Sequence, residues 1–257
     1  MTKIVRFECD GVRYGELREN TIYPLDGTLG AFTASKQTPV PLGDARLLAP
    51  VIPQKIVAVG PNYHAHLKGR QPPPRPHYWI KPPNTLLDPE GVIEIPDLPP
   101  TTCHESELAV IIGSTARNVS PEDAPNYIFG YTCINDVSGG LMHDPPSHVT
   151  SQWMVDGKIY DTFGPLGPCI ETELDTHDLE IQCRVNGEVR QRHRTSDMIW
   201  TPVELVSLIS HVVTLFPGDV VATGSPPGVA PLRPGDVVEV EVEGIGVLRN
   251  HCAAARS

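Results

Sequence analysis

Short apolar runs broken by proline and glycine set the strongest limit on how this chain can fold. The 257 residues include 28 prolines and 22 glycines. Proline has no amide hydrogen and glycine has great backbone freedom, so both interrupt regular structure. Between them stand runs typical of strands, at residues 56–59, 108–112, 181–185 and 237–242. The pattern predicts a mainly β fold with few helices (α+β) and irregular loops.

Two segments have the features of helices. Residues 121–127 follow Ser120, whose side chain can cap a helix N-terminus. In residues 202–215 apolar side chains recur at helical spacing, namely Leu205, Leu208, Ile209, Val212 and Val213. We therefore expect two short helices within a β-rich chain.

The first fifty residues read as a separate β-rich unit. Residues 3–7 and 12–17 alternate as strands do and flank the turn residues Asp10 and Gly11, which predicts a hairpin. Prolines then interrupt the chain at Pro39, Pro41, Pro50 and Pro53. We expect a small N-terminal β-rich domain over residues 1–53 and a main domain over residues 54–257.

Charge and composition exclude several classes of partner. With 20 basic and 31 acidic residues the formal net charge is −11, which opposes binding to nucleic acid or to an anionic membrane surface. No stretch approaches the roughly 20 apolar residues of a membrane span, so a cytoplasmic protein is expected. The six cysteines form no C-x-x-C pair, which favours buried, reduced thiols over a zinc cluster.

Three carboxylates stand at the ends of apolar runs. Glu105 and Glu107 are two residues apart before the run 108–112, so a strand would point both to one face. Asp136 follows another largely apolar run, at residues 127–135. Such a set suits a hard divalent cation, although an E-x-E pair is also common on a solvated surface and a lone Asp can simply cap a turn.

Short motifs follow one another in a fixed order between about residues 55 and 250. They are G-P-N-Y-x-x-H (60–66), I-K-P (80–82), E-S-E-L (105–108), G-Y-T (130–132), N-D (135–136), K-x-x-D-T-F (158–163), G-P (167–168), V-N-G-E (185–188), P-G-D (217–219) and T-G-S-P (223–226). In this order they resemble the fumarylacetoacetate hydrolase family. Val59 stands where fumarylacetoacetase has a fourth acidic ligand, so the chain resembles the three-carboxylate bacterial branch of acylpyruvate hydrolases and 2-hydroxyhepta-2,4-diene-1,7-dioate isomerases.

The resemblance implies a fold and a metal. The family's catalytic domain is a mixed β-roll, barrel-like, and a small β-rich appendage would precede it here. Glu105, Glu107 and Asp136 would bind one Mg²⁺ or Mn²⁺, leaving about three octahedral positions for the oxygens of a small 2-oxo acid and a water. A homodimer is the expected assembly.

The resemblance also assigns roles to side chains outside the metal set. His66 corresponds to the family's general base, Lys158 to a group that stabilises an oxyanion, and Lys81 to a ligand of a substrate carboxylate. Without the motif context, the default reading of each is a structural or surface residue. Thr223, Gly224 and Ser225 would line the substrate pocket.

Several positions depart from the family pattern. Gly69 replaces a glutamate that pairs with the histidine in many family hydrolases, and Glu239 is the alternative partner by alignment with fumarylacetoacetase. The alternation of acidic and apolar residues around Glu239 is equally typical of an exposed strand face. Gly140 replaces an arginine that holds the distal part of the substrate, and His143, at the place of the family's glutamine, would fill part of that role.

These observations leave three functions open. The leading expectation is metal-dependent hydrolysis of a C–C bond in an acylpyruvate-like 2,4-dioxo acid, through an enolate that the metal stabilises. The second is isomerisation, decarboxylation or tautomerisation of a 2-oxo-enoic dicarboxylate of aromatic catabolism. The third, from another class, is a family member that binds metal or ligand without turnover.

Overall fold

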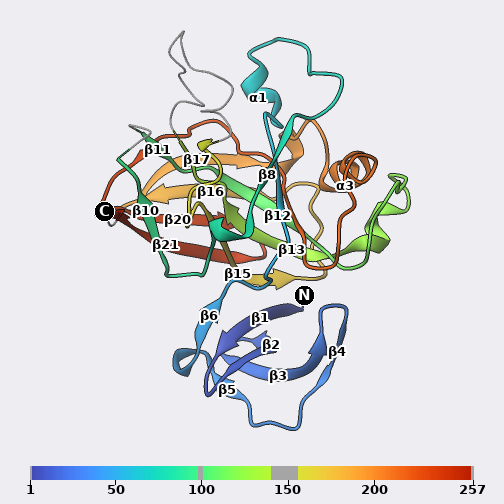
Figure 1. Cartoon of the computed structure of the whole chain (residues 1–257), viewed down its shortest axis with the longest axis vertical. Helices are drawn as coiled ribbons and strands as arrows, with labels where there is room; N and C mark the ends of the chain where they lie inside the picture. The colour runs from blue at the N-terminus through green and yellow to red at the C-terminus, as the bar shows by residue number, and fades with distance from the viewer. Residues whose placement is uncertain (1, 98–100, 140–155, 256–257) are drawn as a thin grey trace.

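The structure is a computed structural model that describes residues 2–97, 101–139 and 156–255. Their strands form three sheets, and one large, strongly curled sheet contains most of the strands (Figure 1). The expected mainly β, barrel-like architecture with a β-rich N-terminal region is confirmed.

The large sheet runs the length of the molecule. Within the described residues its strands are β1 (Lys3–Glu8), β2 (Val12–Arg18), β3 (Thr21–Thr28), β4 (Ala31–Ala34), β5 (Val40–Pro41), β6 (Arg46–Leu48), β7 (Ile56–Val59), β8 (Tyr78–Lys81), β9 (Leu86–Leu87), β12 (Ser106–Ile112), β13 (Ile128–Asn135), β15 (Gly164–Glu171) and β18 (Val220–Ala222). β12 lies between β13 and β18, so the strand that follows Glu105 is central.

Two smaller sheets complete the β structure. The second is ordered β10 (Val92–Ile95), β21 (Gly246–Ala254), β20 (Val237–Val242), β16 (Glu180–Val185) and β17 (Glu188–Arg194). The third is β14 (Ser138–Gly139), β11 (Thr102–Cys103) and β19 (Pro231–Leu232). The four runs that the sequence marked as strands, residues 56–59, 108–112, 181–185 and 237–242, all lie in strands.

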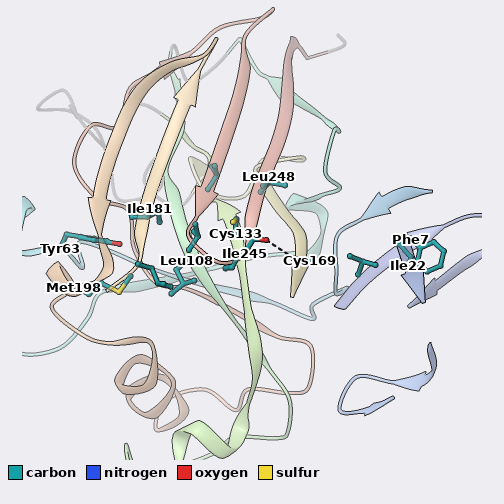
Figure 2. Packing of buried hydrophobic residues seen from close by; sticks show 14 residues of the cluster. Phe7, Ile22, Tyr63, Leu108, Cys133, Cys169, Ile181, Met198, Ile245 and Leu248 are labelled. Carbon is teal, nitrogen blue, oxygen red and sulfur yellow. Dashed lines mark hydrogen bonds between the residues drawn. The ribbon is translucent and has the colours of Figure 1, made fainter. Parts of the chain in front are cut away.

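The alternation of side chains along β12 divides the core. Leu108 is buried with Ile181, Val240 and Leu248 of the second sheet, so the two sheets pack face to face there (Figure 2). Ala109, on the opposite face, packs against residues of β7, β13 and β15. Glu105 and Glu107 share the phase of Ala109, so a strand's period of two directs them to that second face.

The N-terminal strands extend the large sheet. β1 and β2 form the expected hairpin, with Asp10 at φ 52° and Gly11 at φ 117° in the turn. β1 also pairs antiparallel with β15, where Ile4 is opposite Ile170. The N-terminal region is therefore joined to the rest by backbone hydrogen bonds, and the division into domains at residue 53 stays a prediction.

Helical structure is short. The α-helices of the described residues are α1 (His64–Leu67) and α3 (Pro202–Ser210), and 3-10 turns are η1 (Leu42–Asp44), η2 (Pro83–Thr85), η3 (Ala124–Tyr127) and η5 (Thr195–Asp197). None of these helices has the length and apolarity needed to cross a membrane.

Both expected helices are shorter than the sequence suggested. α3 has a capping box between Thr201 and Glu204 and ends at Ser210, because Leu215 instead pairs with Ala116 through two backbone hydrogen bonds of 2.9 and 3.0 Å. The expected α-helix over 121–127 is wrong: Ser120 caps a turn that continues only as η3. Pro125 within that turn has no amide hydrogen for an α-helical bond.

Candidate active site

The register between β12 and β13 brings the three carboxylates together. The strands are antiparallel with Ser106 opposite Asn135, so the start of β12 meets the end of β13. The Asp136 amide donates to the Glu105 carbonyl at 2.9 Å. One oxygen each of Glu105, Glu107 and Asp136 lies within 4.8 Å of the others. Side chains 31 residues apart along the chain thus face one point.

Two lysines enter the same cluster. Lys158 Nζ lies 2.6 Å from Asp136 Oδ2 and 3.1 Å from Glu105 Oε1, and Lys81 Nζ lies 2.6 Å from Asp136 Oδ1. Glu107, Asp136 and Lys81 are 0 % exposed, and Glu105 and Lys158 are also buried. Buried charges persist only when paired, so these five side chains form one electrostatic unit.

The two lysines differ in how strongly they hold their protons. Burial alone would lower the pKa of Lys158, but Asp136, Glu105 and Glu107 together raise it above its usual value. For Lys81 burial dominates and lowers the pKa, with Asp136 opposing that effect. Lys158 is therefore the firmly charged lysine of the cluster.

Burial and neighbouring charges both disfavour the ionised form of Glu107. Burial raises the pKa of its carboxyl well above the usual 4.5, and the charges of Asp136 and Glu105 add to the rise. Glu107 Oε2 accepts a 2.7 Å hydrogen bond from the Gly224 amide. Glu107 Oε1 is buried and has no hydrogen-bond partner among the described residues. An unsatisfied buried oxygen in an all-oxygen donor set fits a Mg²⁺ or Mn²⁺ ion bound by Glu105, Glu107 and Asp136.

His66 lies beside the turn that supports Glu107. It belongs to α1, and its Nε2 lies 2.9 Å from the Ser225 carbonyl. Ser225 directly follows Gly224, the donor to Glu107. A single turn therefore contacts both the acidic cluster and the histidine.

The other residues of that turn are held by the fold. The Thr223 hydroxyl donates to the Leu108 carbonyl at 2.9 Å, and the Ser225 hydroxyl accepts from Gln191 Nε2 at 2.7 Å. Gly224 has φ 98°, and a Cβ there would lie 2.7 Å from Asn62 Cβ. Glycine is required at this position because both the backbone angle and the space exclude a side chain.

Comparison with known proteins identifies the family. Residues 55–253 match the family model described as fumarylacetoacetate (FAA) hydrolase C-terminal. The chain belongs to the fumarylacetoacetate hydrolase family. Its residues 2–50 match a second model, described as Rv2993c-like, N-terminal.

Similar proteins of this family are named for different activities. The mitochondrial oxaloacetate tautomerase Fahd2a of Rattus norvegicus is 36% identical over 82% of this chain and 70% of its own length. The 2-hydroxyhepta-2,4-diene-1,7-dioate isomerase of Mycobacterium marinum has a TM-score of 0.89 at 34% identity, with both chains fully covered. The maleylpyruvate hydrolase of Sphingobium sp. SYK-6, in complex with manganese(II) and pyruvate, has a TM-score of 0.81 at 30% identity, over 99% of this chain and 100% of that one.

Glu239 of this family member lies in the second sheet. It is on β20, where Val238 and Val240 point into the core and Glu239 points to the opposite face. There it forms an ion pair of 2.8 Å with Arg184 on β16. Within the part of the chain that the structure describes, no hydrogen bond or ion pair joins Glu239 to His66.

Three other positions complete the comparison with the family pattern. Gly69 follows α1 at φ 81°, and a Cβ there would have no atom within 4 Å. His143 and Gly140, the expected distal pocket, lie outside the described residues.

Several residues of the site were not singled out from the sequence. The Ser138 hydroxyl donates to Glu105 Oε1, and Lys158 Nζ lies 4.9 Å from the centre of the Trp79 ring. The Asn62 amide bonds the Trp200 and Thr223 carbonyls at 2.9 and 2.7 Å. Asn62 stands inside the motif at residues 60–66 and could have been flagged, and Ser138 follows the N-D motif by two residues. Trp79 carries no such signal.

Proposed function

We propose that this chain catalyses divalent-metal-dependent proton transfer on a small 2-oxo acid, as an isomerase or tautomerase. The observation that carries the proposal is the surroundings of His66. Among the described residues its ring bonds only the Ser225 carbonyl, Gly69 stands where family hydrolases have their glutamate, and Glu239 is engaged by Arg184. A histidine without a carboxylate partner is a poor activator of water but can still move a proton.

The chemistry starts from the acidic cluster. Glu105, Glu107 and Asp136 would hold Mg²⁺ or Mn²⁺, which when bound supplies a Lewis acid for negative charge on the oxygens of the 2-oxo acid. The Lys158 ammonium would donate to the same oxygens as charge develops on them. Lys81 is the second cation available to a substrate carboxylate.

His66 would carry the proton. The Ser225 carbonyl can only accept, so the neutral ring has its hydrogen on Nε2 and its basic nitrogen at Nδ1. In our proposal Nδ1 removes a proton from carbon 3 of the 2-oxo acid. Return of that proton to the 2-oxo oxygen gives the enol tautomer, and its return to the far end of a conjugated chain gives an isomer. The Rattus norvegicus tautomerase and the Mycobacterium marinum isomerase support this reaction class.

C–C bond hydrolysis is the second candidate. The sequence favoured hydrolysis over isomerisation, and the present proposal reverses that order. The similarity to a maleylpyruvate hydrolase over 99% of this chain supports hydrolysis. Water would add to the C4 carbonyl of a 2,4-dioxo acid, the C3–C4 bond would break, and the enol of a 2-oxo acid would leave.

One substrate panel separates these reactions. Purified protein with Mg²⁺ or Mn²⁺ would be given oxaloacetate, a 2-hydroxymuconate-type acid and acetylpyruvate, with products followed by NMR in deuterated water. We expect faster keto–enol exchange or isomerisation, and deuterium at carbon 3. Release of pyruvate from acetylpyruvate with a higher kcat/KM than either proton transfer would establish the hydrolase instead. Metal binding with no turnover of any of the three acids would favour the non-catalytic alternative.

The assembly can be tested separately. The family resemblance is the ground for expecting a homodimer, and light scattering on the purified chain would measure its mass against the 28.0 kDa of one copy.

A further inference from the structure

We propose that Gln191 is a positioning residue that holds the metal-binding carboxylates and His66 in one arrangement. Gln191 lies on β17, in the second sheet, and is 0 % exposed although its neighbours Arg190 and Arg192 face solvent. Its amide contacts the start of β12 on one side and the turn at residues 223–226 on the other. The inference rests on the proposed function, since that function makes these two segments parts of one site.

The hydrogen bonds determine the orientation of the Gln191 side-chain amide. Gln191 Oε1 accepts from the Ser106 backbone amide at 3.1 Å, and a backbone amide can only donate. Gln191 Nε2 donates to the Pro226 carbonyl at 2.6 Å, and a carbonyl can only accept. If the amide were flipped, Nε2 would face the Ser106 amide donor and Oε1 would face the Pro226 carbonyl acceptor. These two partners therefore determine the orientation.

On its oxygen side Gln191 orders the acidic strand. Oε1 also receives the Ser106 hydroxyl at 3.1 Å and faces His104 Nδ1 at 2.9 Å. Ser106 stands between the two glutamates, and His104 directly precedes Glu105. Whether both carboxylates face Asp136 depends on which side chains of β12 point to that face of the sheet.

On its nitrogen side Gln191 orders the turn at residues 223–226. Nε2 donates to the Ser225 hydroxyl at 2.7 Å as well as to the Pro226 carbonyl. From this turn the Gly224 amide donates to Glu107 Oε2, and the Ser225 carbonyl faces His66 Nε2. Displacement of the turn would therefore change the donor to one carboxylate and the partner of the histidine together.

Gln191 thus acts through other residues. A buried amide is costly unless its groups are bonded, and here its hydrogen bonds lead to segments of the candidate site. Groups that orient the ligands of a metal commonly change its affinity 10- to 100-fold when they are replaced. We expect the same class of effect from Gln191.

The test compares Gln191→Met with Gln182→Met in the full chain. Gln182 lies on the adjacent strand β16 and its amide donates to Glu241, away from the carboxylate cluster. The probe is Mn²⁺, with affinity measured by electron paramagnetic resonance. We expect Gln191→Met to weaken Mn²⁺ binding about tenfold and Gln182→Met to leave it unchanged. Equal affinities for wild type and Gln191→Met would contradict the inference.

A second readout needs neither metal nor turnover. In metal-free protein, ¹⁵N NMR of His66 reports whether Nε2 carries its hydrogen toward Ser225. Gln191→Met should shift or broaden this signal, whereas Gln182→Met should not. If wild-type protein failed to bind Mn²⁺, the proposed function would fall, but the His66 signal would still decide whether Gln191 positions the turn.

A milder variant covers the case in which Gln191→Met does not fold. Ser225→Ala removes one of the two acceptors of Gln191 Nε2 and keeps the backbone carbonyl that faces His66. We expect a smaller loss of Mn²⁺ affinity, about two- to fivefold, with the same change in the His66 signal. Unchanged affinity and an unchanged His66 signal in Ser225→Ala would also count against the inference.

Discussion

The Lys158 ammonium lies 2.6 Å from Asp136 Oδ2, and both side chains are buried. Lys158 is thus a fixed cation placed directly against a candidate metal ligand. Replacing it with methionine keeps the length of the side chain and removes the charge. If Lys158 stabilises developing negative charge on the substrate, Lys158→Met should lower kcat by about 10²- to 10³-fold and leave Mn²⁺ binding intact.

Steady-state kinetics and Mn²⁺ titration of the same sample check this prediction. Lys36→Met, at an exposed position, is the control and should behave as wild type. Loss of Mn²⁺ binding together with activity would mean that Lys158 supports the cluster rather than the reaction.

Removal of Glu107 should abolish stabilisation by metal. Glu107 Oε1 is buried and has no hydrogen-bond partner among the described residues, so we expect it to be a strong ligand. At a metal concentration a hundred times Kd, binding stabilises a protein by about 2.7 kcal/mol, which for a chain of this size raises Tm by roughly 5–10 °C. Glu107→Ala should show no such rise in a thermal unfolding experiment with Mg²⁺ or Mn²⁺. A full rise in the variant would exclude Glu107 as a ligand.

Glu239→Ala should leave catalysis unchanged. Its ion pair with Arg184 is partly exposed, and such pairs contribute about 0–1 kcal/mol to stability. We therefore expect kcat/KM within about twofold of wild type and a small change in urea midpoint. A hundredfold loss of kcat/KM would show that Glu239 reaches His66 in the working enzyme, as the alignment with fumarylacetoacetase suggested.

Gly224 should tolerate alanine much less well than a glycine of similar backbone angle. Gly235 has φ 96° with no atom within 4 Å of a built Cβ, so Gly235→Ala measures the backbone strain alone, about 1–2 kcal/mol. Gly224→Ala adds a contact of 2.7 Å with Asn62 Cβ and should cost about 1–3 kcal/mol more. Urea unfolding of both variants tests the difference, and equal free energies of unfolding would be evidence that the turn can move.

The buried thiols should be inert at neutral pH. Burial raises the pKa of Cys183 and of Cys252 to about 12 and that of Cys103 to about 11, and a thiol reacts as its thiolate. At pH 8 a thiol of pKa 12 is ionised to about one part in 10⁴, and the fraction rises tenfold per pH unit. Only Cys9 is partly exposed, so a thiol reagent should modify about one cysteine rapidly in folded protein and all six in urea. Rapid modification of several thiols in the folded state would contradict this assignment.

The local structure of the strands was readable from the sequence because it depends on neighbouring residues. Runs such as 108–112 became strands, and the two-residue spacing of Glu105 and Glu107 predicted a shared face. Where long-range pairing competes with local preference, the sequence was less informative. Helix α3 ends at Ser210 because Leu215 pairs with Ala116, a residue almost a hundred positions earlier.

What the sequence alone determined is the class of fold and the order of the family motifs, which follow from side-chain alternation, turn residues and spacing. The tertiary structure decided which of those groups meet. The register of β12 against β13 brings Asp136 to Glu105 and Glu107. Glu239 forms an ion pair with Arg184, and one amide of Gln191 joins two distant segments. These relations depend on contacts between residues far apart in the chain, and no local pattern encodes such distances.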